Sequence, residues 1–345
     1  MRIPRQVPLT FVMLAAACAN VRAQVELSAP QQAFRDQLAS KVAAGEKRNA
    51  AAIVGKDGWL FLTSELRFLA QGQFWGEGAV KASRTRKPNA ADPLPAIADF
   101  HQQLTQRGIH LLVVPVPAKA AINPDKIGVD ATLNASESAA VQQPFYAELR
   151  RRGIEVLDLT ATFAGHSDPR GPVYCRTDSH WSGVGCLLAA QAIAQEIRKQ
   201  QPPEQPRSQY QTDWKNVSIT GDLAPLTGEA NKPAPEQINV RQVSGAVGPD
   251  ANSPVLVIGD SHTLVFHEFL AERAGLIDQL AAELGFPVDL IGTRGSGATP
   301  VRVSMYRRAR SEPDFLAKKK VVVWCFAARE FTEADQGWVV QPIAK

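Results

Sequence analysis

The stretch from Pro254 to Thr263 constrains the fold of this chain more strongly than any other part of the sequence. Its residues from Val255 to Ile258 are apolar, and the run ends abruptly at Gly259-Asp260-Ser261. Such a run is typical of a buried strand in an α/β sheet, and the polar residues after it lie at the edge where these sheets bind ligands. Ser261 is then either a nucleophile or part of a plain helix cap. We expect the residues from Leu264 to Ala271 to continue as a helix.

A second stretch, from Tyr174 to Trp181, contains Asp178 and His180. A serine hydroxyl is a poor nucleophile at neutral pH and needs an imidazole base, which in turn needs a carboxylate to orient it. Two residues apart in an extended loop, Asp178 and His180 point to the same side. The sequence therefore predicts a catalytic set of Ser261 as nucleophile, His180 as base and Asp178 as its orienting acid.

The remainder of the chain alternates helical and strand-like apolar patterns. This alternation predicts one α/β domain over residues 24–345, a three-layer α/β/α sandwich with a mainly parallel sheet. Strands are expected over 109–117, 154–159, 254–258, 287–292 and 320–326, and helices over 97–107, 139–152 and 182–200.

Three further segments lie outside this alternation. Residues 24–50 are expected to form an amphipathic helix, and Asp57-Gly58 between two apolar runs predicts a β-hairpin. Residues 201–252 are rich in Pro, Gln and Asn, which predicts an irregular insertion over the site.

The chain begins with a pattern typical of a targeting segment. Arg2 and Arg5 precede an apolar run from Val7 to Ala19, and small residues around Ala23 suit a signal peptidase. We expect residues 1–23 to be a cleaved signal peptide and the protein to be periplasmic. A lipid-anchored Cys18 or an uncleaved N-terminal membrane anchor are the alternatives.

The formal net charge of +4 does not point to nucleic acid. Removing residues 1–23 would take away three arginines and no acidic residue, which leaves a nearly neutral protein. No basic stripe interleaved with aromatic residues is present, so a nucleic-acid partner is not expected.

The four cysteines give little sign of a metal site. Cys175 and Cys186 flank the Asp–His loop and could form a disulfide in an oxidising compartment, or stay reduced. Since no Cys/His cluster has zinc-like spacing, we expect no metal, and the predicted chemistry needs no bound cofactor.

A glycine turn, Gly295-Ser296-Gly297, follows the expected strand at 287–292. Backbone amides of such a turn beside a nucleophile can stabilise an oxyanion, although a glycine turn is often only a turn.

The chain also resembles a known family. Gly259-Asp260-Ser261, preceded by Asp178-Ser179-His180-Trp181, is similar to the alginate O-acetyltransferase AlgX/AlgJ family of SGNH-hydrolase-like enzymes, which acetylate exopolysaccharides in the periplasm. Common SGNH esterases place Asp and His after the serine, so this permuted order is the most specific part of the likeness. Further similar stretches, which extend the likeness over nearly all of residues 24–345, are Asp57–Phe61, Val114–Lys119, Val323-Trp324 and Arg329-Glu330. The architecture is closer to AlgJ, and the carbohydrate-binding module of the AlgX branch is not expected.

The resemblance implies an SGNH-like fold and a serine-dependent polysaccharide O-acetyltransferase with Ser261, His180 and Asp178 in the roles given above. An acetyl group would come from a membrane-bound O-acyltransferase partner, within an exopolysaccharide secretion complex, and pass through an acetyl-enzyme to a polysaccharide such as alginate. Gly295, Arg329 and Trp181 are the candidate oxyanion or substrate contacts, although Trp181 could equally be a wall of the core.

Other polar residues near the motifs are given lesser roles. We expect His262 to face solvent or the rim of the cleft, and Lys119 to lie at the cleft edge or to pair with a carboxylate. His101, His110, His166 and His267 are expected to be surface or packing residues.

Two other functions stay open from the sequence. A secreted carbohydrate O-acetyl esterase would use the same three residues with water as acceptor. A non-catalytic adaptor of a secretion complex would use the cleft only to hold polymer, and would not need all three residues.

Overall fold

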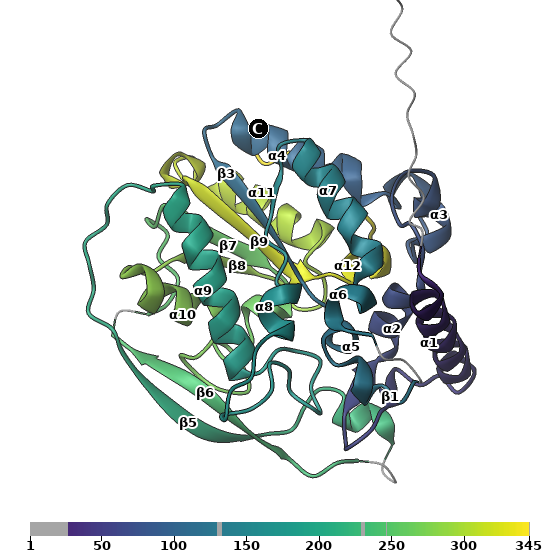
Figure 1. The fold of residues 1–345 in the computed structure, drawn as a ribbon. Helices are drawn as coiled ribbons and strands as arrows, with labels where there is room; N and C mark the ends of the chain where they lie inside the picture. The colour runs from purple at the N-terminus through teal and green to yellow at the C-terminus, as the bar shows by residue number, and fades with distance from the viewer. Residues whose placement is uncertain (1–26, 130–132, 229–231, 246, 345) are drawn as a thin grey trace, which may run out of the picture.

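A five-stranded parallel sheet organises the chain (Figure 1). The computed structural model describes residues 27–129, 133–228, 232–245 and 247–344. The strand order is β4-β3-β9-β7-β8, with the strands β3 (His110–Val116), β4 (Glu155–Val156), β7 (Val255–Gly259), β8 (Asp289–Gly292) and β9 (Val321–Ala327). Strands β3, β7 and β9 are buried almost throughout, as expected for parallel strands covered on both faces.

Helices cover both faces of this sheet, so the predicted α/β sandwich is confirmed. In Figure 1, α7 and α9 lie in front of the sheet and α11 lies behind it. The helices are α1 (Ala29–Lys47), α2 (Thr63–Ala70), α3 (Ala79–Ala82), α4 (Pro93–Thr105), α5 (Lys119–Ile122), α6 (Ala135–Ser138), α7 (Gln143–Arg151), α8 (Thr160–Ala164), α9 (Gly183–Lys199), α10 (Leu276–Leu284), α11 (Thr299–Ser311) and α12 (Glu330–Glu333).

The N-terminal part of the described chain packs beside the sheet. Helix α1 buries Phe34, Leu38 and Val42, one apolar residue per turn. The hairpin predicted at Asp57-Gly58 is present, with β1 (Ala52–Val54) antiparallel to β2 (Leu60–Leu62). Both turn residues have positive φ angles, 53° and 75°, which Asp and Gly tolerate.

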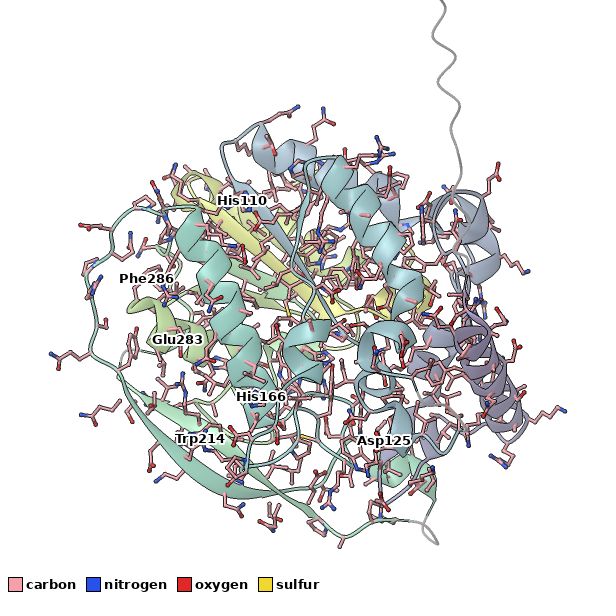
Figure 2. All side chains as sticks on the ribbon, in the orientation of Figure 1. His110, Asp125, His166, Trp214, Glu283 and Phe286 are labelled. Atoms are coloured by element: carbon pink, nitrogen blue, oxygen red, sulfur yellow. The ribbon has the colours of Figure 1, made fainter. Side chains whose placement is uncertain are left out.

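The segment predicted as an irregular insertion at 201–252 is partly regular, which corrects that expectation. It contains two nine-residue antiparallel strands, β5 (Gln211–Ile219) and β6 (Glu236–Ser244). In β6 the buried residues Ile238, Val240 and Val243 face the protein, while β5 is mostly exposed. Figure 2 shows Trp214 of β5 on the outer side of the molecule, where Arg170 stacks on its ring.

The helix predicted from Leu264 to Ala271 does not form. After a short 3-10 turn at Ser261–Thr263 the backbone folds back on itself, and Phe266 and Leu270 take positive φ angles of 63° and 66°. A helix does not allow such angles. The amide of Phe266 instead donates to the carbonyl of Phe269, which makes a compact loop beside the serine.

Residues 1–23, the expected signal peptide or anchor, lie outside the described residues. Within the described part of the chain, no helix combines the length and the apolar character needed to cross a bilayer.

Candidate active site

Ser261 lies at the carboxyl end of the buried strand β7, at the sheet edge that the sequence predicts. Only glycine fits before the turn at position 259, because a Cβ there would lie 1.8 Å from the carbonyl oxygen of Cys325 in β9. The chain can therefore pass close to the neighbouring strand and then turn sharply. Ser261 begins the 3-10 turn and is partly exposed, so its hydroxyl can reach a substrate.

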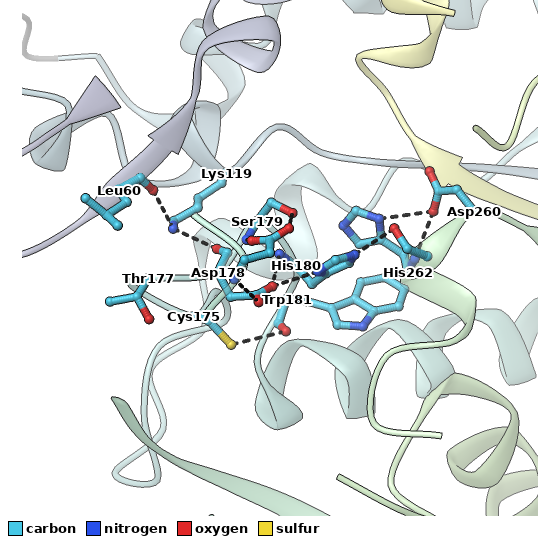
Figure 3. Close-up of polar contacts among 12 residues, drawn as sticks. Leu60, Lys119, Cys175, Thr177, Asp178, Ser179, His180, Trp181, Asp260 and His262 are labelled. Carbon is cyan, nitrogen blue, oxygen red and sulfur yellow. Dashed lines mark hydrogen bonds and ion pairs between the residues drawn. The ribbon is translucent and has the colours of Figure 1, made fainter. Parts of the chain in front are cut away.

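The three residues predicted to form the catalytic set meet in one chain of hydrogen bonds. His180 Nε2 lies 2.7 Å from Ser261 Oγ, and His180 Nδ1 lies 2.6 Å from Asp178 Oδ1. Figure 3 shows the His180 ring next to Asp178. The contact to the carboxylate fixes the Nδ1–H tautomer, which leaves Nε2 free to accept the serine proton.

The electrostatics of this pair suit a general base. Burial by itself lowers the pKa of His180, but the hydrogen bond and the negative charge of Asp178 outweigh it, and the pKa is raised from 6.5. Burial raises the pKa of Asp178, but the bonds from His180 and from the backbone amide of Asp222 lower it below 3.8. Asp178 therefore stays ionised and would stabilise an imidazolium on His180.

The loop that contains Asp178 and His180 is compact, whereas the sequence predicted an extended loop. A β-bridge between Tyr174 and Trp181 closes it, and the Asp178 side chain turns back to accept from the His180 amide at 2.9 Å. The helix predicted over 182–200 begins directly afterwards as α9, capped by the hydroxyl of Ser182.

Lys119, expected at the cleft edge or paired with a carboxylate, is fully buried behind this loop and donates to backbone carbonyls. Its Nζ donates to the carbonyl oxygens of Leu60, Arg176 and Asp178, at 2.7, 2.9 and 3.0 Å. All three ammonium protons are therefore used, and Figure 3 shows Lys119 between Leu60 and Asp178. Burial lowers the pKa of Lys119 to about 8, and the nearby carboxylate of Glu65 opposes that shift.

Two acidic residues from the 201–252 segment fix the other side of the loop, and the sequence analysis missed both. Glu236 of β6 accepts from the amides of Arg176 and Thr177, each at 2.8 Å. Asp222 accepts from the amide of Ser179 at 2.7 Å, and its own amide donates to Asp178 Oδ2 at 2.9 Å. The segment is thus part of the site and does more than cover it.

His262 is buried, which corrects the expectation that it faces solvent. Its Nδ1 lies 3.1 Å from Asp260 Oδ1, and burial lowers its pKa to about 4, so it is neutral at pH 7. Asp260 also accepts from the Ala327 amide at 2.7 Å. These bonds fix the turn on either side of Ser261, and among the described residues only the side chain of His180 bonds the serine hydroxyl.

The glycine turn predicted near the nucleophile is in place, but Gly297 lies nearer to it than Gly295. A Cβ at Gly297 would lie 3.1 Å from the amide nitrogen of Asp260, whereas a Cβ at Gly295 would meet open space. Trp324 Nε1 fixes this peptide by donating to the Gly297 carbonyl at 2.7 Å. Neither the Ser261 nor the Gly297 amide has a hydrogen-bond partner among the described residues.

Arg329 and Trp181, the other two predicted contacts, differ in their access to a ligand. Arg329 follows β9, is half-buried, and is close enough to lower the pKa of Asp260. Its side chain has no ion pair with any residue that the structure describes. Trp181 has 0% of its surface exposed and packs edge-on against His262, so it is a wall of the core and cannot stack on a sugar.

The remaining histidines do not reach Ser261. His110 Nε2 lies 2.8 Å from Glu155 Oε2, and Figure 2 shows His110 at the start of β3, the end of the strand away from the site. His267 pairs with Asp278, and His166 lies near Asp168. Asp178, His180 and Asp222 place possible metal-ligand atoms within 4.8 Å of one another, and the carboxylates of Asp178 and Asp222 also accept hydrogen bonds within the loop.

This chain is similar to proteins that are named as acetyltransferases or acetylases. Residues 52–328 match the family described as SGNH hydrolase-like domain, acetyltransferase AlgX. A probable alginate O-acetylase AlgJ from Pseudomonas aeruginosa is 27% identical over 310 residues, which cover 84% of this chain and 74% of the relative. The corresponding Pseudomonas syringae protein is 29% identical over 308 residues, covering 84% and 73%. The O-acetyltransferase domain of Pseudomonas putida AlgJ superposes with a TM-score of 0.63 at 24% identity, over 82% of this chain and 92% of that domain.

Proposed function

The chain belongs to the SGNH hydrolase-like AlgX acetyltransferase family, and from this membership we propose that it transfers acetyl groups to an exported polysaccharide through Ser261. Relatives named as probable alginate O-acetylases favour alginate or a related exopolysaccharide as acceptor. The single observation that supports the serine mechanism is the hydrogen-bond chain from Ser261 through His180 to Asp178.

In the first half-reaction, Ser261 Oγ attacks the carbonyl carbon of an acetyl donor. His180 Nε2 takes the serine proton and returns it to the leaving group of the donor, which leaves an acetyl ester on Ser261. Asp178 stabilises the imidazolium in between. The donor we propose is an acetyl group supplied by a membrane-bound O-acyltransferase partner.

In the second half-reaction, a sugar hydroxyl attacks the acetyl carbonyl. His180 removes the hydroxyl proton and then protonates Ser261 Oγ as the ester bond to the enzyme breaks. In both steps the negative oxygen of the tetrahedral intermediate needs hydrogen-bond donors. The amides of Ser261 and Gly297 are the donors we propose, and Arg329 would add positive charge beside them.

The expected cellular setting follows from the acceptor. An enzyme that acetylates a polymer during export would encounter that polymer in the periplasm. A leader in residues 1–23 would bring the protein there. We propose a place in an exopolysaccharide secretion complex, next to the membrane-bound acetyl donor.

The test is acetyl transfer by the purified protein, from a chromogenic acetyl ester to alginate oligosaccharides. Wild type should yield acetylated sugar, and Ser261→Ala and His180→Ala should yield none. Ser311→Ala and His101→Ala are matched controls, because Ser311 is exposed at the end of α11 and His101 lies on α4, neither bonded to the site.

Each other result selects a different function. Ester consumption without acetylated sugar, for every oligosaccharide offered, favours the esterase. Absence of labelling by a serine-reactive acyl probe favours the adaptor. Full transfer by Ser261→Ala would overturn the assignment of the nucleophile.

A further inference from the structure

A cavity of about 1020 Å³ lies between α1, α3 and the segment that follows α2. None of its lining residues belongs to the hydrogen-bond chain of Ser261. The residues that give the cavity its chemistry are Arg35, Gln71, Gln73, Trp75, Glu77 and Lys81. Its volume is at the upper end of the range found for small-molecule sites, so it has room for more than one sugar unit.

Arg35 brings a positive charge to the wall of this cavity. Its Nη2 donates to the carbonyl of Ala70 at 3.1 Å, which fixes the guanidinium. Its Nε is buried and has no hydrogen-bond partner among the described residues. Burial shields this Nε from a ligand, so the charge of the guanidinium is what Arg35 offers to the cavity.

Another part of the lining combines an aromatic ring with amide side chains. Trp75 is partly exposed, and its other surface packs against Phe74 and Phe145, with ring centroids 5.1 and 5.3 Å away. The ring is therefore held rigidly while one part of it faces the cavity. A fixed aromatic face beside amide and charged groups is suited to a sugar ring, which presents C–H bonds on its faces and hydroxyls at its edge.

The cavity is joined to the active-site end of the sheet through one aromatic cluster. Phe74 stacks on Phe331 at 5.2 Å, and Phe331 is two residues after Arg329 at the end of β9. Figure 1 shows α1, α2 and α3 together on the side of the molecule where β9 ends and α12 begins.

We propose that this cavity is an accessory binding site for a carboxylated sugar unit of the acceptor polysaccharide. Arg35 and Lys81 supply the positive charges for the carboxylate, Gln71, Gln73 and Glu77 meet hydroxyls, and Trp75 supports the ring. The site would hold one part of a chain while another part reaches Ser261. The inference rests on the proposed function only in taking the acceptor to be a polysaccharide.

The experiment uses the full chain with Ser261→Ala, so that no acetyl transfer alters the ligand. Hexamannuronate and cellohexaose are the probes, since both are β-1,4-linked hexapyranoses and only the first is charged. Calorimetry measures affinity, and hydrogen–deuterium exchange shows which amides the ligand protects. We expect hexamannuronate to protect residues 71–82 and cellohexaose to leave them unchanged.

Charge substitutions then test the contacts. Adding Arg35→Gln or Lys81→Gln should weaken hexamannuronate binding about tenfold each, as for loss of one charged hydrogen bond. Lys47→Gln is the matched control, an exposed lysine at the last turn of α1 that does not line the cavity, and it should bind as before.

If residues 71–82 are not protected, or if all variants bind hexamannuronate equally well, the cavity is not the binding site. If cellohexaose binds with the same affinity, the site does not select a carboxylated sugar. Failure of wild type to acetylate any sugar, with protection and charge dependence intact, would reject the proposed function and leave this site standing.

Discussion

Nζ of Lys119 lies 3.0 Å from the backbone carbonyl oxygen of Asp178, while the side chain of the same aspartate bonds His180. A buried ammonium group at the start of α5 thus fixes the backbone that orients the acid. The same ammonium bonds Leu60 of β2 and Arg176 of the loop, so it joins the N-terminal hairpin to the site. We therefore regard Lys119 as a positioning residue.

Replacing Lys119 by methionine should impair both folding stability and activity. The buried carbonyl oxygens of Leu60 and Asp178 would lose this donor, and each unsatisfied group of this kind costs about 1–3 kcal/mol. The carbonyl oxygen of Arg176 would keep the amide of Leu60 as a donor at 2.9 Å. We expect a loss of at least about 2 kcal/mol in unfolding free energy, measured in urea, since the backbone can relax in part. In the fraction that stays folded, kcat should fall more than KM rises, because the Asp178–His180 pair loses its support and the substrate contacts do not.

Lys126→Met is the matched control for this substitution. Lys126 makes a surface ion pair with Asp57 at 2.8 Å, and such pairs contribute little to stability. Wild-type stability and kcat in Lys119→Met would show that the three contacts are dispensable.

The pH dependence of acetyl transfer should report the Asp178–His180 pair. His180 accepts a proton only when it is neutral, and its pKa is raised from 6.5. Activity should therefore fall as the pH is lowered through a midpoint above 6.5. In Asp178→Asn the charge that raises this pKa is gone, so the midpoint should move to lower pH, and kcat should drop about 10³- to 10⁴-fold, as when the orienting acid of a triad is removed.

A pH series of kcat/KM for wild type and Asp178→Asn measures both effects. Asp125→Asn serves as the control, because this exposed acid lies outside the site and should leave the midpoint unchanged. An unshifted midpoint in Asp178→Asn would mean that another group sets the profile.

Glu236→Gln should loosen the loop from the side of β6. The carboxylate accepts three hydrogen bonds, from the amides of Arg176 and Thr177 and from the Thr177 hydroxyl. An amide group presents one acceptor oxygen and turns its NH₂ toward a donor, so at least one bond is lost. We expect lower kcat and faster amide exchange over residues 175–180. Gln237→Glu, on the exposed neighbour, should change neither.

The main features of the site could be predicted from local sequence. A buried apolar run that ends in Gly-Asp-Ser needs no knowledge of the remaining chain to place Ser261 at a sheet edge. Asp178 and His180 are close in sequence, so their contact was also predictable, although the loop that joins them is closed by a bridge and is not extended. The meeting of this loop with Ser261, across 81 residues, follows from the parallel sheet.

What the sequence did not reveal depends on distant contacts. Nothing near Glu236 in the sequence indicates that its carboxylate caps amides in a loop 59 residues away. Residues 264–271 have a helical apolar pattern, but Gly275 lies so close to His267 that a Cβ there would come within 2.7 Å of the His267 amide nitrogen. That packing requires the chain to turn back, and tertiary contacts outweigh the local helical preference.

The three cysteines in the described residues should behave as inert thiols. Cys175, Cys186 and Cys325 are all buried and unbridged, so the disulfide considered for Cys175 and Cys186 is absent. Burial raises the pKa of all three thiols well above the usual value of 9, which removes the reactive thiolate. Ellman's reagent should leave these three thiols unlabelled in the native protein and label them after denaturation in urea. Peptide mapping under non-reducing conditions should find Cys175 and Cys186 in separate peptides, and a linked peptide would contradict this arrangement.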